Sequence, residues 1–259
     1  MVQTTYAAPV DALLSVGEPH GRKWADYLTQ FNLTAADIPE LIRMATDSDL
    51  NWAASESLEV WAPVHAWRSL GQLKAEAAIK PLIAIFNEMD DSDWFREEMP
   101  EVFSSIGPTA IPDVAEFLAN PKNMFSSRWM SAEILVQMEH KHPSARDECL
   151  SGLIQQLGQY SKNSRELNGA LICALIDLEA REAAPFIEAA FSAKRVDTSM
   201  AGDWIEVQHA LGSLSRSDVY ELRNYVDAEH LEAKATKLRE SAGGFGGAMK
   251  ASSKGKKRK

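Results

Sequence analysis

One short apolar stretch recurs along the chain, and this repetition constrains the fold more than any other feature of the sequence. Residues 111–118 read IPDVAEFL. Four similar stretches share the apolar spacing, and all but the third also carry a proline: 38–45 (IPELIRMA), 79–86 (IKPLIAIF), 146–153 (RDECLSGL) and 183–190 (AAPFIEAA). Proline suits the first turn of a helix because its missing N–H would have no partner there. Each stretch therefore predicts the start of a helix.

The spacing of these starts predicts a repeat architecture. Equivalent positions lie 42, 31, 36 and 37 residues apart, at Pro39, Pro81, Pro112, Glu148 and Pro185. This spacing is typical of two-helix repeats. A partner helix is expected before each marked one, for example at 64–70 and 98–106, each followed by a glycine that suits a helix end. Because such short pairs cannot bury their apolar faces alone, we expect an all-α fold, an α-solenoid of about five helix pairs.

The sequence divides into three expected segments. Residues 1–36 are expected to form N-terminal capping helices that shield the first repeat. Residues 37–240 are expected to form the solenoid, which a charged helix at 217–240 closes. Residues 241–259 begin with a glycine-rich connector and end in a basic run, which is typical of a disordered tail.

The charge of the chain is divided unevenly between its body and this tail. Residues 250–259 hold six basic and no acidic residues. The first 249 residues therefore carry 21 basic against 37 acidic residues, or −16, within a total of −10. An acidic body is a poor partner for duplex DNA, which requires a positive face. The basic residues expected to contact RNA, ribosome or anionic lipid weakly are Lys250, Lys254, Lys256, Lys257, Arg258 and Lys259.

Motifs for catalysis, metals and cofactors are not found in the sequence. Cys149 and Cys173 lie in apolar helical contexts and predict buried thiols in a reducing compartment. His140 and His142, two residues apart, would point away from each other on a helix, so we expect no metal and no cofactor. No apolar run reaches the length of a membrane span, and residues 1–10 lack the features of a signal peptide. We expect a cytoplasmic protein without a membrane span, and the sequence favours a binding protein over an enzyme.

The first helix of each pair is the expected position of a partner-binding groove, because this helix lines the inner face of such arrays. Aligning the repeats at Leu70, Ile106 and Met138 places His65, Glu101 and Glu133 at equivalent positions. Exposed tryptophan and arginine are the residue types that anchor interfaces, although the same tryptophans would also fit a core. The candidate groove residues are Trp61, His65, Arg68, Trp94, Glu97, Glu98, Glu101, Arg128, Trp129 and Glu133.

Pro100 is predicted to lie inside one of these helices and to bend it, since proline removes a backbone donor. The bend would turn Trp94, Glu97 and Glu98 toward the groove. If both carboxylates are exposed there, the double substitution to lysine should weaken partner binding and leave thermal stability nearly unchanged. A large loss of stability would instead assign them to a structural contact with Arg68 or Arg128.

Two sequence blocks carry a family resemblance. Residues 65–73 (HAWRSLGQL) followed by 77–82 (AAIKPL) resemble HEAT-like repeats, and in particular the short bacterial HEAT repeats of phycobilisome bilin lyases. Residues 94–103 and 201–204 are similar to uncharacterised bacterial HEAT-repeat proteins, and the resemblance covers roughly 37–210. It implies a fold more strongly than a function. Some related bacterial proteins end in a cysteine-rich zinc motif, and residues 252–259 contain no cysteine.

Three functions are compatible with the sequence. The first is a non-enzymatic scaffold that binds a protein or peptide, especially one with a basic segment, in the groove. The second is implied by the resemblance and by the seven tryptophans: a bilin lyase-like or chaperone-like factor that handles a tetrapyrrole or another bulky ligand. The third is association with nucleic acid or the ribosome through the basic tail.

Overall fold

The computed structural model describes residues 5–19, 21, 23–226, 232 and 234, and this part of the chain is helical without any strand. The predicted all-α class is therefore confirmed. The α-helices with assigned bounds are α1 (Tyr27–Phe31), α2 (Ile38–Ala45), α3 (Ser48–Asn51), α4 (Ala62–Gln72), α5 (Ile79–Ala84), α6 (Asp93–Ile106), α7 (Ile111–Ala119), α8 (Phe125–Lys141), α9 (Arg146–Leu157), α10 (Arg165–Asp177), α11 (Ala184–Ser192), α12 (Thr198–Ala201) and α13 (Trp204–Ala210).

Six of these helices begin with the same local structure. A three-residue 3₁₀ turn runs directly into α2, α5, α7, α9 and α11, the five stretches that the sequence pattern marks, and Glu59–Trp61 runs in the same way into α4. The turns before the five marked helices are Ala35–Asp37, Glu76–Ala78, Pro108–Ala110, Pro143–Ala145 and Arg181–Ala183. The last residue of the latter four turns is a buried alanine, which lets the turn pack closely on its neighbours. Proline occupies the first turn of α2, α7 and α11, where its missing N–H has no intrahelical partner.

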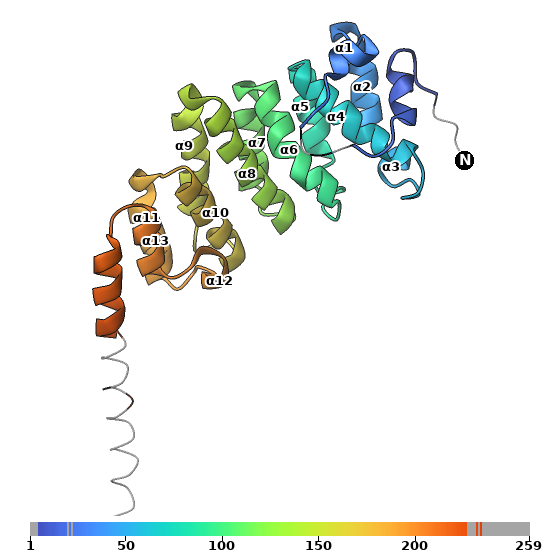
Figure 1. Cartoon of the computed structure of the whole chain (residues 1–259). Helices are drawn as coiled ribbons and strands as arrows, with labels where there is room; N and C mark the ends of the chain where they lie inside the picture. The colour runs from blue at the N-terminus through green and yellow to red at the C-terminus, as the bar shows by residue number, and fades with distance from the viewer. Residues whose placement is uncertain (1–4, 20, 22, 227–231, 233, 235–259) are drawn as a thin grey trace, which may run out of the picture.

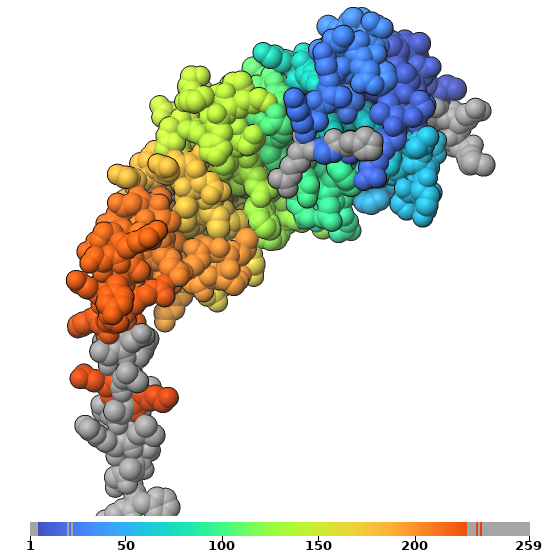
Figure 2. All heavy atoms as spheres, in the orientation of Figure 1, coloured from blue at the N-terminus to red at the C-terminus, as the bar shows by residue number. Residues whose placement is uncertain are grey.

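The helices form two layers along one curved row, which Figure 1 shows from the N-terminal to the C-terminal end. In the first layer α4 contacts α6, α6 contacts α8, and α8 contacts α10. In the second layer α5 contacts α7, α7 contacts α9, and α9 contacts α11. Contacts of α7 and α9 with α8 join the layers, so one apolar core runs through the curved body in Figure 2.

Several local predictions need correction. The sequence of 51–71 favours one helix that bends or breaks near Pro63, whereas α4 begins at Ala62 with Pro63 in its first turn. At the N-terminus, the 3₁₀ helix Val10–Ser15 and the five-residue α1 take the place of two α-helices. α1 begins only at Tyr27 because the Asp26 side chain caps it by accepting a hydrogen bond from the Thr29 N–H.

At the C-terminal end residues 216–226 are helical, and most of this helix is exposed. Arg223 joins it to the body through ion pairs with Glu206, at 2.7 Å, and Asp203, at 3.3 Å. The predictions for 241–259 and for most of 227–240 lie outside the described residues. Within the described part, no helix combines the length and apolar character needed to cross a membrane.

Candidate functional site

A groove of about 1060 Å³ runs along the first layer of helices. Its walls come from α6, α8 and α10, which are neighbours in the first layer, and from the segment that precedes α1. Side chains three or four residues apart share one face of a helix, so the i, i+4 pairs Glu97 and Glu101 in α6 and Trp129 and Glu133 in α8 point into the same space. The lining residues are Lys23, Trp24, Arg96, Glu97, Glu98, Pro100, Glu101, Trp129, Glu133, Val136, Gln137, Ala170, Cys173, Ala174 and Asp177.

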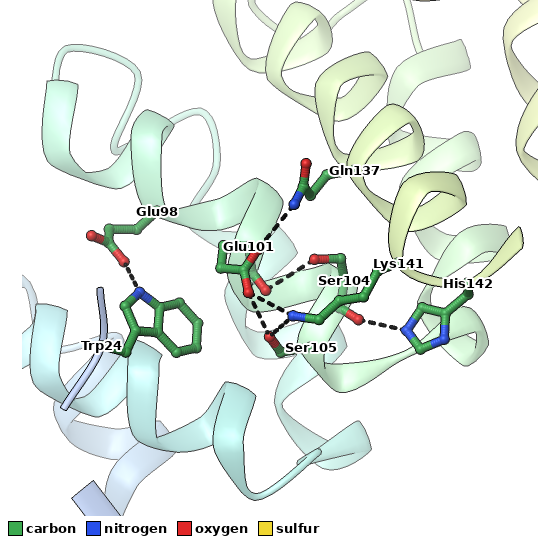
Figure 3. A network of polar contacts seen from close by, with 8 residues as sticks. All are labelled: Trp24, Glu98, Glu101, Ser104, Ser105, Gln137, Lys141 and His142. Carbon is green, nitrogen blue, oxygen red and sulfur yellow. Dashed lines mark hydrogen bonds and ion pairs between the residues drawn. The ribbon is translucent and has the colours of Figure 1, made fainter. Parts of the chain in front are cut away.

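A buried ion pair closes the end of the groove nearest the N-terminus. The Arg68 guanidinium in α4 donates from Nε to Oε2 of Glu98 in α6 over 3.0 Å, and its Nη2 bonds the other carboxylate oxygen. Trp24 donates from Nε1 to the same Oε2 over 3.1 Å, as Figure 3 shows. Glu98 therefore joins α4, α6 and the segment before α1, and its carboxylate is committed to these contacts.

A second polar network joins α6 to α8 (Figure 3). Glu101 accepts hydrogen bonds from Gln137, at 3.0 Å, and from Lys141, at 2.5 Å. Lys141 also donates to Ser105 Oγ over 2.7 Å, and His142 contacts the Ser104 carbonyl over 2.8 Å. These bonds hold the two helices in register along the wall of the groove.

Glu133, half-buried in α8, differs from these two carboxylates. Glu98 forms an ion pair with Arg68, and Glu101 forms one with Lys141. In contrast, no ion pair or hydrogen bond joins the Glu133 side chain to another described residue. Burial raises the pKa of Glu133, the negative charge of Asp177 raises it further, and attraction to Arg96 acts in the opposite sense. A half-buried carboxylate without an ion pair is therefore available to a cation that enters the groove.

Two exposed acids without ion pairs in the described part accompany Glu133. Glu97 lies in α6 and Asp177 at the end of α10, so each of the three helices contributes one such carboxylate. Beside them lie the half-buried indole of Trp129 and the half-buried thiol of Cys173. The cations of the lining are Lys23 and Arg96, and Arg96 pairs with Asp93 at 2.5 Å. The groove thus combines acidic and aromatic groups, which suits a long cationic side chain.

Five of the ten predicted groove residues line this cavity: Glu97, Glu98, Glu101, Trp129 and Glu133. The other five lie elsewhere. Trp61 and Trp94 pack edge to face, with ring centroids 5.1 Å apart, outside the lining. The interpretation of His65, Arg68 and Arg128 as groove residues needs correction, because all three are buried.

His65 and Arg128, which take no part in the Arg68–Glu98 ion pair, form hydrogen bonds within the core. His65 Nε2 lies 2.7 Å from the Gly17 carbonyl, and its Nδ1 lies 2.8 Å from the Tyr27 hydroxyl. Because the carbonyl can only accept, Nε2 carries the proton and Nδ1 accepts from Tyr27. Arg128 donates from Nε to the Leu118 carbonyl over 2.7 Å, at the C-terminal end of α7, where a cation is favourable.

Pro100 is inside α6, as the sequence predicts, and it also lines the groove. The cap of α6 is Ser92, whose hydroxyl accepts from the Phe95 N–H, so the helix starts at Asp93. Glu97 and Glu98 are predicted to turn toward the groove together, but their surroundings differ. Glu97 is exposed, whereas Glu98 is buried against Arg68.

The predicted groove residues include none from α10 or from the segment before α1, although both line the groove. Continuing the repeat alignment from Met138 to Leu175, which like Leu70 accepts a hydrogen bond from an alanine N–H five residues later, places the lining residue Ala170 at the position of Glu133. No local sequence pattern marks Trp24 as a groove residue, because its partner Glu98 lies 74 residues further along the chain. Within the described residues, no group of three or more His, Cys, Asp and Glu side chains is placed to hold a metal ion. No protein-family model, curated protein or solved structure matches this chain.

Proposed function

We propose that this chain is a non-enzymatic α-solenoid of about five HEAT-like helix pairs, and that its groove binds a basic segment of a protein partner. The two-layer packing and the five repeated 3₁₀-to-α starts support the repeat interpretation. The observation that carries the binding proposal is Glu133, a half-buried carboxylate without an ion pair among the described residues. Burial of such a charge is unfavourable, and a cation from a partner would offset that desolvation.

The shape and charge of the groove favour a peptide over a planar cofactor. Trp24 and Trp129 are the tryptophans of the lining, and five carboxylates lie around them. A tetrapyrrole carries acidic side chains, which these carboxylates would repel. A lysine or arginine side chain would instead gain both ion pairing and contact with the Trp129 ring.

A binding experiment with a defined probe tests this proposal. A fluorescently labelled peptide of ten residues, alternating lysine with serine, is titrated with the full chain at low salt, and fluorescence anisotropy is followed. The groove variant carries Glu97→Gln, Glu133→Gln and Asp177→Asn. Its matched control carries Glu116→Gln, Glu148→Gln and Glu188→Gln, three exposed acids on α7, α9 and α11 of the second layer. Both variants lose three negative charges.

The groove variant is expected to bind the peptide at least about tenfold more weakly than the wild type, because each lost ion pair removes a directional contact. The control variant should bind within about twofold of the wild type, since distant surface charges are screened by salt. Equal weakening in both variants would show that net charge alone attracts the peptide, and the groove would then have no specific role.

A further inference from the structure

We propose that the groove has a ligand in its own chain: the basic segment 250–259 occupies it and competes with the partner. This inference rests on the proposed function, because it names an occupant of the same groove. It makes the chain self-inhibited, so that a partner must displace the segment to bind.

Charge complementarity is the first argument. Glu97, Glu133 and Asp177 line the groove without an ion pair among the described residues, one on each of its three helices. The segment KASSKGKKRK offers six cations in ten residues and no acid. Its small serine, alanine and glycine residues leave the cationic side chains free to reach opposite walls. Several cations that pair with several carboxylates at once bind more tightly than a single ion pair at the surface does.

The path of the chain is the second argument. Arg223 holds the helix at 216–226 against α13 through Glu206 and Asp203, and α13 contacts α11. The second-layer helix α11 packs on α9, and α9 in turn contacts α10, which lines the groove. The chain therefore leaves the body at the end where α10 contributes Cys173 and Asp177.

The intervening chain is long enough to return. Residues 235–249 can span up to about 50 Å when extended. They include a glycine-rich stretch, GGFGG at 243–247, which turns easily. A connector of this length allows the segment to fold back toward α10.

Attachment to the same chain makes even weak ion pairing effective. A flexible connector holds its ligand at an effective concentration in the millimolar range, which a partner at micromolar concentration must overcome through its own affinity. The segment would thereby exclude weakly basic peptides in general, and it would admit partners that make further contacts, for example with Trp129.

The test uses the full chain and a labelled peptide with the sequence of 250–259. In the tail variant Lys250, Lys254, Lys256, Lys257, Arg258 and Lys259 are all replaced by glutamine. Anisotropy is measured for the wild type, for the tail variant, and for the tail variant combined with either the groove or the second-layer triple substitution. The tail variant is expected to bind the peptide at least about tenfold more tightly than the wild type, because the internal competitor is lost. The groove substitutions should abolish this gain and the second-layer substitutions should keep it.

The outcomes separate this inference from the function on which it rests. Equal, groove-dependent affinity of the wild type and the tail variant would overturn self-occupancy and leave the groove as a binding site for basic segments. Peptide binding that the groove substitutions leave unchanged in every background would overturn both self-occupancy and the proposed function. Carbodiimide coupling of the wild type in dilute solution then identifies the chain that supplies the segment. Links between 250–259 and Glu97 or Asp177 within a monomer support the proposal, whereas links found only in dimers would assign the segment to a second copy.

Discussion

Arg68 and Glu98 form a buried, two-point ion pair between α4 and α6, with Nε of Arg68 3.0 Å from Oε2 of Glu98. Arg68 is 2% exposed and Glu98 is 8% exposed. Trp24 donates a further hydrogen bond to the same carboxylate oxygen. The pair therefore fixes the first wall of the groove and leaves Glu97, one residue earlier, as the carboxylate that faces solvent.

The first prediction follows from this burial. Glu98→Gln is expected to lower the free energy of unfolding by about 3–5 kcal/mol, because it leaves the Arg68 guanidinium buried without a counter-ion. Glu97→Gln should change it by less than about 0.5 kcal/mol, as is usual for an exposed position. Urea denaturation followed by tryptophan fluorescence measures both values. Similar small losses for the two variants would contradict a structural role for the ion pair.

Much of the fold could be predicted because its signals are local. Proline in a first turn and the apolar spacing after it depend on neighbouring residues, so the starts of α2, α7 and α11 were found from sequence. The site was found only in part. Glu97, Glu101 and Glu133 follow the helical period, whereas the burial of Arg68 depends on a partner 30 residues away. A charged residue in an amphipathic pattern is normally a surface residue, and local periodicity cannot identify the exceptions.

The second prediction concerns pH and Glu133. Burial raises the pKa of this carboxyl in the folded chain, and Asp177 contributes in the same direction. The folded state therefore binds more protons than the unfolded state above the usual glutamate pKa of about 4.3, and stability falls as pH rises through the folded pKa. Glu133→Gln should thus be more stable than the wild type at pH 7, and the difference should disappear below about pH 4.

Denaturant titrations at pH 7 and pH 4 measure this difference, with Glu116→Gln as the exposed control. The same Glu133→Gln protein should bind the basic peptide more weakly, so stability and binding would move in opposite directions. A loss of stability at pH 7 would instead indicate that Glu133 has a stabilising partner.

A third prediction, of opposite sign, concerns His65. Burial lowers the pKa of its imidazole, Arg68 lowers it further, and the contact with the Gly17 carbonyl and the charge of Glu98 oppose the shift. The folded state therefore binds fewer protons than the unfolded state, so stability is lost as pH falls below the ordinary histidine pKa of about 6.5. His65→Gln should show a smaller drop in unfolding free energy between pH 8 and pH 5 than the wild type. His140→Gln, at an exposed position, should keep the drop of the wild type.

The last prediction concerns the contact between Gly71 and Trp24 at the end of the groove. A Cβ at position 71 would lie 2.9 Å from Cζ3 and 3.0 Å from Cη2 of the Trp24 ring, and 3.3 Å from Cβ of Ser105. Gly71→Ala should therefore displace the indole, weaken its 3.1 Å bond to Glu98, and destabilise the chain by about 1–3 kcal/mol, as overpacking usually does.

A double-mutant cycle with Trp24→Ala separates this clash from other effects of the added methyl group. Without the indole, Gly71→Ala should become neutral or stabilising by up to about 1 kcal/mol, because alanine is favoured over glycine inside a helix. A coupling energy of at least about 1 kcal/mol between the two positions is therefore expected. If Gly71→Ala is equally destabilising in both backgrounds, the ring does not rest on Gly71, and the clash must then lie with Ser105.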